Sequence, residues 1–354
     1  MLEIRCTGSP HEMGVIHGTT AKDQITGSIA FYSRLFQTTC SLSWPEVVQE
    51  AAKYVQALED IAPRYLEEIK GIASGSGLPF LDILALNIRT EITFGLFSDA
   101  AQDLASAPSD GCTSLGWLTA AGSFLGQNWD WDPAQAPNLV VCRVSQPGTG
   151  IPDIAMVTEA GIVGKIGLNA AGVGCCLNAI KCRGVDAAKL PIHFALRAVL
   201  ESPSRAAAAE AVKSAGVAGS GHILVGDATG STGLECTSAW VKEVVMDDAG
   251  RVCHTNHLIL DTSDVDEQPW LDDSPVRLAR IRELTARTTE PTLDVIADAF
   301  RDTDGYPSSI NRHVRDKSTI ETLFTIVMDL TKRSARVTFG RPTEVREQVV
   351  MSFE

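Results

Sequence analysis

Gly111-Cys112 is the pair of residues in this sequence that could do chemistry on the chain itself. A cysteine thiol can attack the carbonyl carbon of the residue before it and turn that amide into a thioester, which water then cleaves. Gly111 leaves its carbonyl open to attack, because glycine has no side chain and tolerates strained backbone. The product would begin at Cys112 with a free α-amine. The ordinary pKa of that amine, about 7.7–8.0, suits it to act as the base for its own thiol.

Two strand-like runs after this pair bring a carboxylate to the cysteine. Residues 113–118 and 123–128 are typical of strands, and the four residues 119–122 between them are typical of a turn. If the strands pair from Leu118 and Ser123 at the turn, the register places Cys112 opposite Trp129. Asp130 then lies one residue from the position opposite Cys112. A thiol and a carboxylate are therefore expected at the same end of a two-stranded ribbon.

Two ordinary roles compete with this chemistry. Asp110-Gly111 is also typical of a simple turn, and a single cysteine is often a small buried hydrophobic residue. Asp130, in turn, could merely cap the end of a strand. The predicted register, which brings the carboxylate to the thiol, favours the catalytic interpretation of both residues.

The pattern around this ribbon resembles the signature of the N-terminal-nucleophile hydrolases, in residues 110–114 and 126–130. Within that group the chain is most similar to the fungal acyl-coenzyme A:isopenicillin N acyltransferase family, also called the 6-aminopenicillanic acid acyltransferases. Further motifs carry the resemblance over nearly the whole chain, at Gly14–Gly18, Leu86–Glu91, Thr158–Lys165, Gly167–Val173, His254–His257 and Phe339–Thr343. Several motifs in the same order are far more specific than any one of them.

The resemblance implies an α+β fold built as a four-layer αββα sandwich, with autocatalytic cleavage between Gly111 and Cys112. Strand-like runs interrupted by blocks of helices are consistent with two sheets packed between helical layers. We therefore expect a mostly helical fragment, 1–111, that stays bound to a catalytic fragment, 112–354, as a heterodimer. The small and polar stretch 100–110 suits a processable loop.

Four further residues take roles from the resemblance. Asp130 matches the aspartate that holds and polarises the amine or thiol of the nucleophile. Asn256 matches an asparagine whose amide stabilises the oxyanion of a tetrahedral intermediate, although it could be only a turn residue. Asn178 ends a predicted strand, at a place where related cysteine-type amide hydrolases use an asparagine for the same oxyanion. Arg312 matches a family arginine that could bind a substrate carboxylate, although a surface arginine is the common alternative.

A metal site is a weaker interpretation of the remaining ligand-type residues. His254 and His257 form an H-x-x-H pair, but side chains three residues apart on a strand point to opposite faces. Cys175, Cys176 and Cys182 lack the paired spacing of metal ligands, so we expect them to be core thiols. We expect no metal and no cofactor, since a coenzyme A thioester would be a substrate.

The expected reaction is transfer of an acyl group from a coenzyme A thioester, or from a side-chain amide, to an amine or to water. The amine would resemble 6-aminopenicillanic acid, and Cys112 would carry the acyl group as an S-acyl intermediate. One departure concerns the acceptor, because Cys236-Thr237-Ser238 stands where penicillin-forming members carry Phe-Ser-Pro. The alternative function is that of an unprocessed or non-catalytic homologue that binds a ligand or a partner.

The composition indicates which classes of partner and which cellular compartment to expect. The formal net charge of −14 argues against binding to nucleic acid or to a membrane surface, since both need a basic face. The first residues do not resemble a signal peptide, and no run approaches the about 18 apolar residues of a membrane span. Nine irregularly spaced cysteines suit a reducing compartment. The last residues are not the Ser-Lys-Leu-type peroxisomal address of the penicillin-forming members, so we expect a cytoplasmic protein.

The elements that must position these residues change in kind at Cys112. Before it, the patterns predict a short strand at 2–6 and helices over 14–36, 43–58, from 63 to the glycines at 75–77, and 81–92. After it, we expect strands at 113–118, 123–128, 139–145, 154–158, 162–168, 173–178, 222–227, 233–237, 241–246, 252–256, 323–328 and 335–339. Helices are expected at 191–200, 204–215, 274–288 and 292–300.

Overall fold

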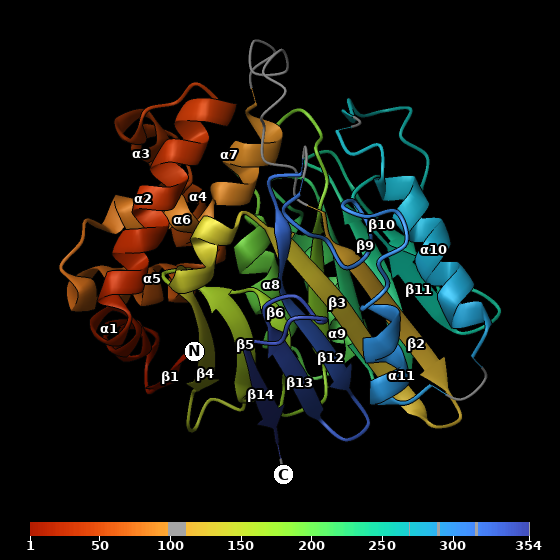
Figure 1. Cartoon of the computed structure of the whole chain (residues 1–354). Helices are drawn as coiled ribbons and strands as arrows, with labels where there is room; N and C mark the ends of the chain where they lie inside the picture. The colour runs from red at the N-terminus through yellow and green to blue at the C-terminus, as the bar shows by residue number, and fades with distance from the viewer. Residues whose placement is uncertain (98–110, 269, 289–290, 316–317, 354) are drawn as a thin grey trace.

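The computed structural model describes residues 1–97, 111–268, 270–288, 291–315 and 318–353 (Figure 1). The predicted processing loop at 100–110 lies outside the described residues. In the described part of the chain, no helix combines the length and the apolar character that crossing a membrane requires.

The segment before Cys112 is mostly helical, as predicted. It contains β1 (Leu2–Thr7), α1 (Pro10–Thr20), α2 (Lys22–Thr39), α3 (Trp44–Ala52), α4 (Val55–Ile61), α5 (Pro63–Ser76), α6 (Phe80–Asn87) and α7 (Arg89–Gly95). Three of the predicted helices are each divided in two. Two of the divisions fall at Ala21 and Ile88, where φ is −112° and −109° and the backbone leaves helical geometry. Apolar periodicity reports which residues are buried, but it does not report where a helix bends.

Helix α1 lies very close to α5 because the residues of α1 that face α5 include two glycines. A Cβ atom at Gly14 would lie 2.0 Å from the carbonyl oxygen of Glu68, and one at Gly18 would lie 2.2 Å from that of Ile72. Only glycine permits this approach of two backbones. The motif Gly14–Gly18 therefore serves the packing of the helical segment.

The structure has two sheets, and all of their strands except β1 follow Cys112. Those strands are β2 (Thr113–Thr119), β3 (Gly122–Trp131), β4 (Leu139–Ser145), β5 (Ile154–Glu159), β6 (Ile166–Asn169), β7 (Gly174–Ala179), β8 (Gly221–Asp227), β9 (Gly230–Cys236), β10 (Val241–Val244), β11 (Arg251–His254), β12 (Glu321–Asp329), β13 (Ser334–Phe339) and β14 (Glu347–Ser352). The larger sheet has the order β1-β4-β5-β6-β7-β8-β9-β10, and the smaller has the order β11-β2-β3-β12-β13-β14. A 3-10 helix, η2 (Pro133–Asn138), links β3 to β4.

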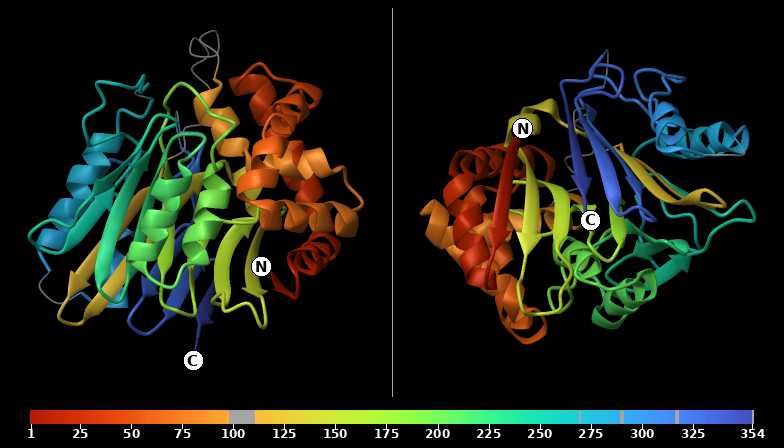
Figure 2. Two further views of the ribbon diagram at one scale, coloured as in Figure 1. Left: turned by 180° about the vertical axis from the view of Figure 1, so that it is seen from behind. Right: turned by 90° about the horizontal axis from the view of Figure 1, so that it is seen from below.

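The layers form the four-layer αββα sandwich that the sequence predicts. Strands β2 and β3 of the smaller sheet face β7, β8 and β9 of the larger one. Helices α8 (Ile192–Leu200) and α9 (Arg205–Ala215) cover the outer face of the larger sheet, as do the N-terminal helices at its β1 end (Figure 2). Helices α10 (Ser274–Ala286) and α11 (Leu293–Ala299) cover the smaller sheet (Figure 1).

The hairpin β2–β3 has the predicted register. Leu118 pairs with Ser123, and the ladder continues to Thr113 opposite Asn128. Extended by one residue, that register sets Cys112 opposite Trp129. The observed register therefore agrees with the prediction that Cys112 and Asp130 lie at the same end of the hairpin.

Candidate active site

Cys112 lies fully buried at the start of β2, directly after a glycine that is packed against an arginine. A Cβ atom at Gly111 would lie 2.5 Å from Nε of Arg312, so the guanidinium occupies the space of any larger residue's side chain. This close approach explains the glycine, since no other residue type leaves that space free.

Arg312 joins two carboxylates at this point. Its Nε lies 3.7 Å from Oδ2 of Asp130, and its terminal nitrogen donates a hydrogen bond to Asp273. Thr322 donates to the other oxygen of Asp130 at 2.6 Å and accepts from the backbone N–H of Arg312 at 3.0 Å. Burial, followed by the charge of Arg277, lowers the pKa of Arg312. The residue predicted to bind a substrate carboxylate is thus buried and already engaged by carboxylates of its own chain.

Arg277 holds the backbone of the nucleophile, and sequence reasoning missed it. One terminal nitrogen donates to the carbonyl oxygen of Cys112 at 2.7 Å, and the other donates to Oδ1 of Asn256 at 3.0 Å. Its Nε donates to Asp273 at 2.6 Å. Although burial alone would raise the pKa of Asp273, Arg277 and Arg312 hold it below its ordinary value. In the sequence, Arg277 is simply one of several arginines on a helix, so nothing marks it.

Asn256 is fixed at both ends of its amide. Oδ1 accepts from Arg277, and Nδ2 donates one hydrogen to the carbonyl oxygen of Ala179 at 2.9 Å. Its backbone N–H donates to Oγ of Ser274 at 2.8 Å. The second amide hydrogen remains for another acceptor, as the predicted role at an oxyanion requires.

Asn178, the neighbour of Ala179 on β7, lies fully buried between the two sheets. Its Oδ1 accepts from Oγ of Ser114 at 2.7 Å and lies 3.0 Å from Nδ1 of His222. Ser114 is two residues after Cys112, so both side chains share one face of β2. These hydrogen bonds, joined through the chain at Ala179–Asn178 and at Cys112–Ser114, form a series beside Cys112 that we call the polar ring, whose members are Arg277, Asn256, Ala179, Asn178 and Ser114.

The histidines of the H-x-x-H pair are each used in hydrogen bonds. Nε2 of His254 lies 2.8 Å from Glu235, and its Nδ1 lies 2.9 Å from the carbonyl oxygen of Thr255. His257 has Nδ1 at 2.7 Å from Oγ of Ser274. Burial, then the neighbouring His254 and Arg277, lower the pKa of His257 to about 4. These contacts give both histidines structural roles beside the polar ring.

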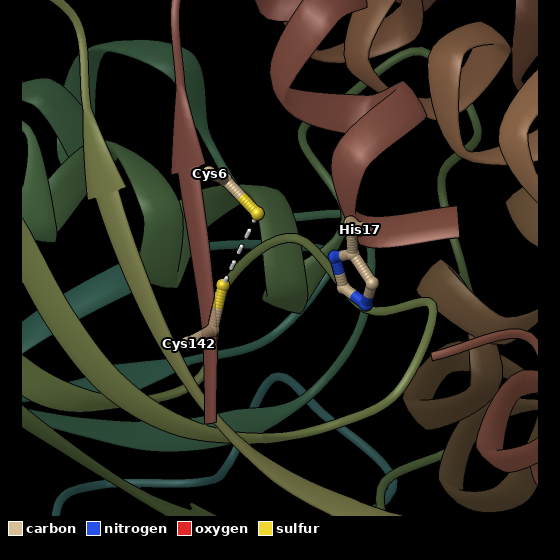
Figure 3. Close-up of side chains that lie close together, drawn as sticks. All are labelled: Cys6, His17 and Cys142. Atoms are coloured by element: carbon tan, nitrogen blue, oxygen red, sulfur yellow. Dashed lines mark hydrogen bonds between the residues drawn. The ribbon is translucent and has the colours of Figure 1, made fainter. Parts of the chain in front are cut away.

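A second group of metal-type ligands, Cys6, His17 and Cys142, lies in the core between β1, α1 and β4 (Figure 3). The two sulfurs are 4.0 Å apart. The backbone N–H of Gly161 donates to Nε2 of His17 at 3.0 Å, and burial lowers the pKa of His17 to about 4. The neutral ring therefore carries its proton on Nδ1, and its only lone pair is already in use. A metal-bound histidine instead donates its second N–H, so this group is not prepared for a metal.

Comparison with known proteins shows which family the chain is similar to. A family model described as acyl-coenzyme A:6-aminopenicillanic acid acyl-transferase matches residues 117–344. The chain is 38% identical, over 100% of its length and 96% of the relative, to the 40 kDa form of acyl-coenzyme A:6-aminopenicillanic-acid-acyltransferase of Emericella nidulans. It is 30% identical to an N-acylethanolamine-hydrolyzing acid amidase of Caenorhabditis elegans, over 45% of this chain and 49% of that protein. A conjugated bile acid hydrolase variant from Clostridium perfringens superimposes with a TM-score of 0.48 at 14% identity, over 68% and 92% of the two chains.

Proposed function

Because the chain belongs to the acyl-coenzyme A:6-aminopenicillanic acid acyltransferase family, we propose that it is an autoprocessed enzyme with an N-terminal cysteine nucleophile. It takes an acyl group from a coenzyme A thioester, or from an amide, and passes it to an amine or to water. The polar ring carries this proposal. It ties the carbonyl of Cys112 and two buried asparagine amides into one constellation.

Processing cleaves the bond between Gly111 and Cys112. Sγ attacks the carbonyl carbon of Gly111, the carbon–nitrogen bond breaks, and the nitrogen takes the thiol proton and leaves as the α-amine of Cys112. Water then hydrolyses the thioester, which returns the thiol and leaves a carboxylate on Gly111. Arg277 holds the carbonyl on one side of the bond, and Arg312 packs on the other side. The fragments 1–111 and 112–354 remain together as a heterodimer.

Acyl transfer uses the amine that processing exposes. The α-amine takes the thiol proton, and the thiolate of Cys112 attacks the acyl carbonyl while amide hydrogens of Asn256 and Asn178 stabilise the oxyanion. The thiol of coenzyme A leaves with that proton. An acceptor amine, or water, then attacks the S-acyl group, and its proton returns to the sulfur of Cys112. Thioester-to-thioester exchange is nearly balanced in energy, which favours a cysteine nucleophile for this donor.

Asp130 supplies the negative charge beside the reacting amine. It is fully buried, and its hydrogen bond from Thr322 and its pairing with Arg312 fix its position. A fixed carboxylate favours the charged form of a nearby amine and so raises its pKa, while burial acts in the opposite direction. Asp130 therefore orients the base and sets the pH at which it works.

The acceptor is an amine that resembles 6-aminopenicillanic acid, as the name of the Emericella relative suggests. A carboxylate on that amine would reach Arg312 only by competing with Asp130 and Asp273. The segment Cys236-Thr237-Ser238 leaves room for a different acceptor. All nine cysteines are free and buried, which suits the reducing cytosol.

Turnover tests this function directly. Purified protein is incubated with phenylacetyl-coenzyme A and 6-aminopenicillanic acid, and free coenzyme A thiol and acylated products are measured by chromatography. We expect thiol release by the wild type and none by Cys112→Ala. Release of coenzyme A thiol at equal rates by both proteins would exclude Cys112 as the nucleophile. If the wild type released neither thiol from acyl-coenzyme A donors nor amine from amide donors, the proposed function would be excluded.

A further inference from the structure

His222 is a buried histidine beside Asn178 that the reaction above does not use. It lies on β8 directly opposite Asn178 of β7, and both side chains are completely buried. Its Nδ1 is 3.0 Å from Oδ1 of Asn178, the same oxygen that accepts from Ser114 at 2.7 Å.

The ring of His222 is held in place from two sides. It stacks on His254 with ring centroids 3.7 Å apart and planes inclined by 9°. On the other side Gly233 makes room for it, since a Cβ atom there would lie 2.4 Å from Nε2. Any side chain at residue 233 would therefore displace the imidazole from this position.

The position of the single ring proton follows from these surroundings. Burial, and then the neighbouring His254, lower the pKa of His222 well below its ordinary value, so the ring is neutral. Nε2 has no hydrogen-bond partner among the described residues, whereas Nδ1 faces the side-chain oxygen Oδ1 of Asn178. A buried N–H is stable only where an acceptor meets it. The proton therefore lies on Nδ1 and is donated to Asn178.

This proton decides which way the amide of Asn178 points. With Oδ1 facing Nδ1–H of His222 and the hydroxyl of Ser114, both lone pairs of the oxygen are used. Turning the amide over would set its NH2 group against the N–H of His222. The nitrogen Nδ2 is thus kept on the opposite side, where it is buried and forms no hydrogen bond within the part of the chain described. That leaves a donor available to an acceptor from outside the described residues.

We propose that His222 is a positioning residue for the oxyanion hole. Its Nδ1–H, with the hydroxyl of Ser114, fixes Asn178 so that Nδ2 is presented to the acyl carbonyl oxygen beside Cys112. The next residue, Ala179, holds Asn256, so two amide donors are set by adjacent residues of one strand. This inference rests on the proposed acyl transfer and identifies what prepares its second oxyanion donor.

Kinetics of three variants test the proposal. His222→Phe keeps a flat ring on His254 but removes the donor. We expect kcat to fall about tenfold or more with KM unchanged, because the contact to Asn178 matters for the transition state. His222→Asn, whose amide N–H can replace Nδ1–H, should recover much of that loss. His193→Phe is the matched control, since His193 is equally buried but forms its hydrogen bonds with Thr90 and Gly164. This variant should lose stability but keep the kcat of the wild type.

Dependence on Asn178 separates positioning from general packing. In an Asn178→Ala background, His222→Phe should cause no further loss of kcat. An equal loss in both backgrounds, or unchanged kcat in the single variant, would overturn the proposal while leaving the acyltransferase function intact.

The tautomer can be checked without any activity. Nitrogen-15 NMR of histidine-labelled protein, assigned by the signal absent from His222→Phe, should show a neutral ring protonated at Nδ1 at neutral pH. Protonation at Nε2 would overturn the proposal whatever the turnover. A Nδ1–H ring in a wild type that has no acyl-transfer activity would instead refute the proposed function.

Discussion

Arg312 and Gly111 form the tightest contact at the predicted cleavage bond. The guanidinium lies where the side chain of any residue other than glycine would begin, and two carboxylates hold it there. Gly111 therefore matters for more than an open carbonyl, because its size sets the distance between the scissile peptide and the Asp130–Arg312 pair. The sequence predicts Gly111, but it does not reveal the arginine against which it packs.

Gly111→Ala should slow processing. The added methyl group would displace Arg312, and overpacking of this kind costs about 1–3 kcal/mol. If that strain falls on the reacting geometry, cleavage becomes about 10- to 100-fold slower. The uncut chain is followed with time on denaturing gels. Cleavage at the wild-type rate would show that Arg312 yields without consequence. Gly148→Ala strains a left-handed backbone (φ +80°) away from the bond and crowds no atom within 4 Å, so it controls for general destabilisation.

Asp130→Asn should keep the fold and lose about 100-fold or more in kcat. Thr322 can still donate to the oxygen of an amide of the same shape, and Asp273 still pairs with Arg312, so the fold should be kept although the loss of one buried counter-charge lowers the unfolding midpoint. The charge that favours a protonated amine is lost, so the alkaline-rising limb of kcat/KM should move to lower pH. Turnover equal to that of the wild type would show that Asp130 has no catalytic role.

The hairpin β2–β3 is the element that sequence reasoning predicts best. The turn at 119–122 sets the pairing of Leu118 with Ser123 and so the whole register, and a slip by one residue would turn every side chain to the opposite face. The partners of Asn178 and Cys112 could not be predicted in the same way. His222 and Arg277 reach them from β8 and α10, and such contacts depend on how separate elements pack.

The helical segment is joined to the sheets by a buried group of charges. Arg89 of α7 and Lys165 both pair with Glu159 of β5, and Tyr32 of α2 donates to the same carboxylate. Burial alone would raise the pKa of Glu159, but the two cations lower it below its ordinary value. The predicted fragments 1–111 and 112–354 would therefore share a charge cluster as well as the parallel pairing of β1 with β4.

Glu159→Gln should destabilise the protein by about 3–5 kcal/mol, because it leaves two buried cations without their counter-charge. Denaturant unfolding measures the effect. The matched control is Glu50→Gln, whose partner Lys53 is largely exposed on α3 and whose loss should cost less than about 1 kcal/mol. If both variants lost the same small amount, the buried cluster would not be what joins the two segments.

Across the whole molecule, the order of the helical and sheet layers is predictable from the sequence, but the number of strands and the ends of the helices are not. Blocks of strands and helices indicate the αββα sandwich, and the structure has it. β14, however, lies at the edge of the smaller sheet and carries several exposed residues, so its pattern lacks a buried face that sequence reasoning could detect. The predicted helices that divide in two have a different cause, because apolar periodicity does not report where a helix bends.

Stability should fall as the pH falls from about 6.5 to 4. His17 has a pKa of about 4 in the folded protein against an ordinary value of 6.5, so the unfolded chain binds the proton more readily in this window. The stabilisation is complete above pH 6.5 and is lost toward pH 4, by up to about 3 kcal/mol. His17→Gln keeps an acceptor for Gly161 but cannot titrate. Its melting temperature should therefore depend less on pH than that of the wild type, and parallel curves would contradict this assignment.

Intact mass spectrometry of purified protein incubated with phenylacetyl-coenzyme A reports cleavage at Gly111–Cys112 and acylation of Cys112 in one measurement. We expect two masses, for 1–111 and 112–354, with one phenylacetyl group on the second. We expect one uncut and unmodified chain for Cys112→Ala. An uncut wild-type chain that never carries the acyl group, or cleavage of Cys112→Ala at the same bond, would contradict the proposed function.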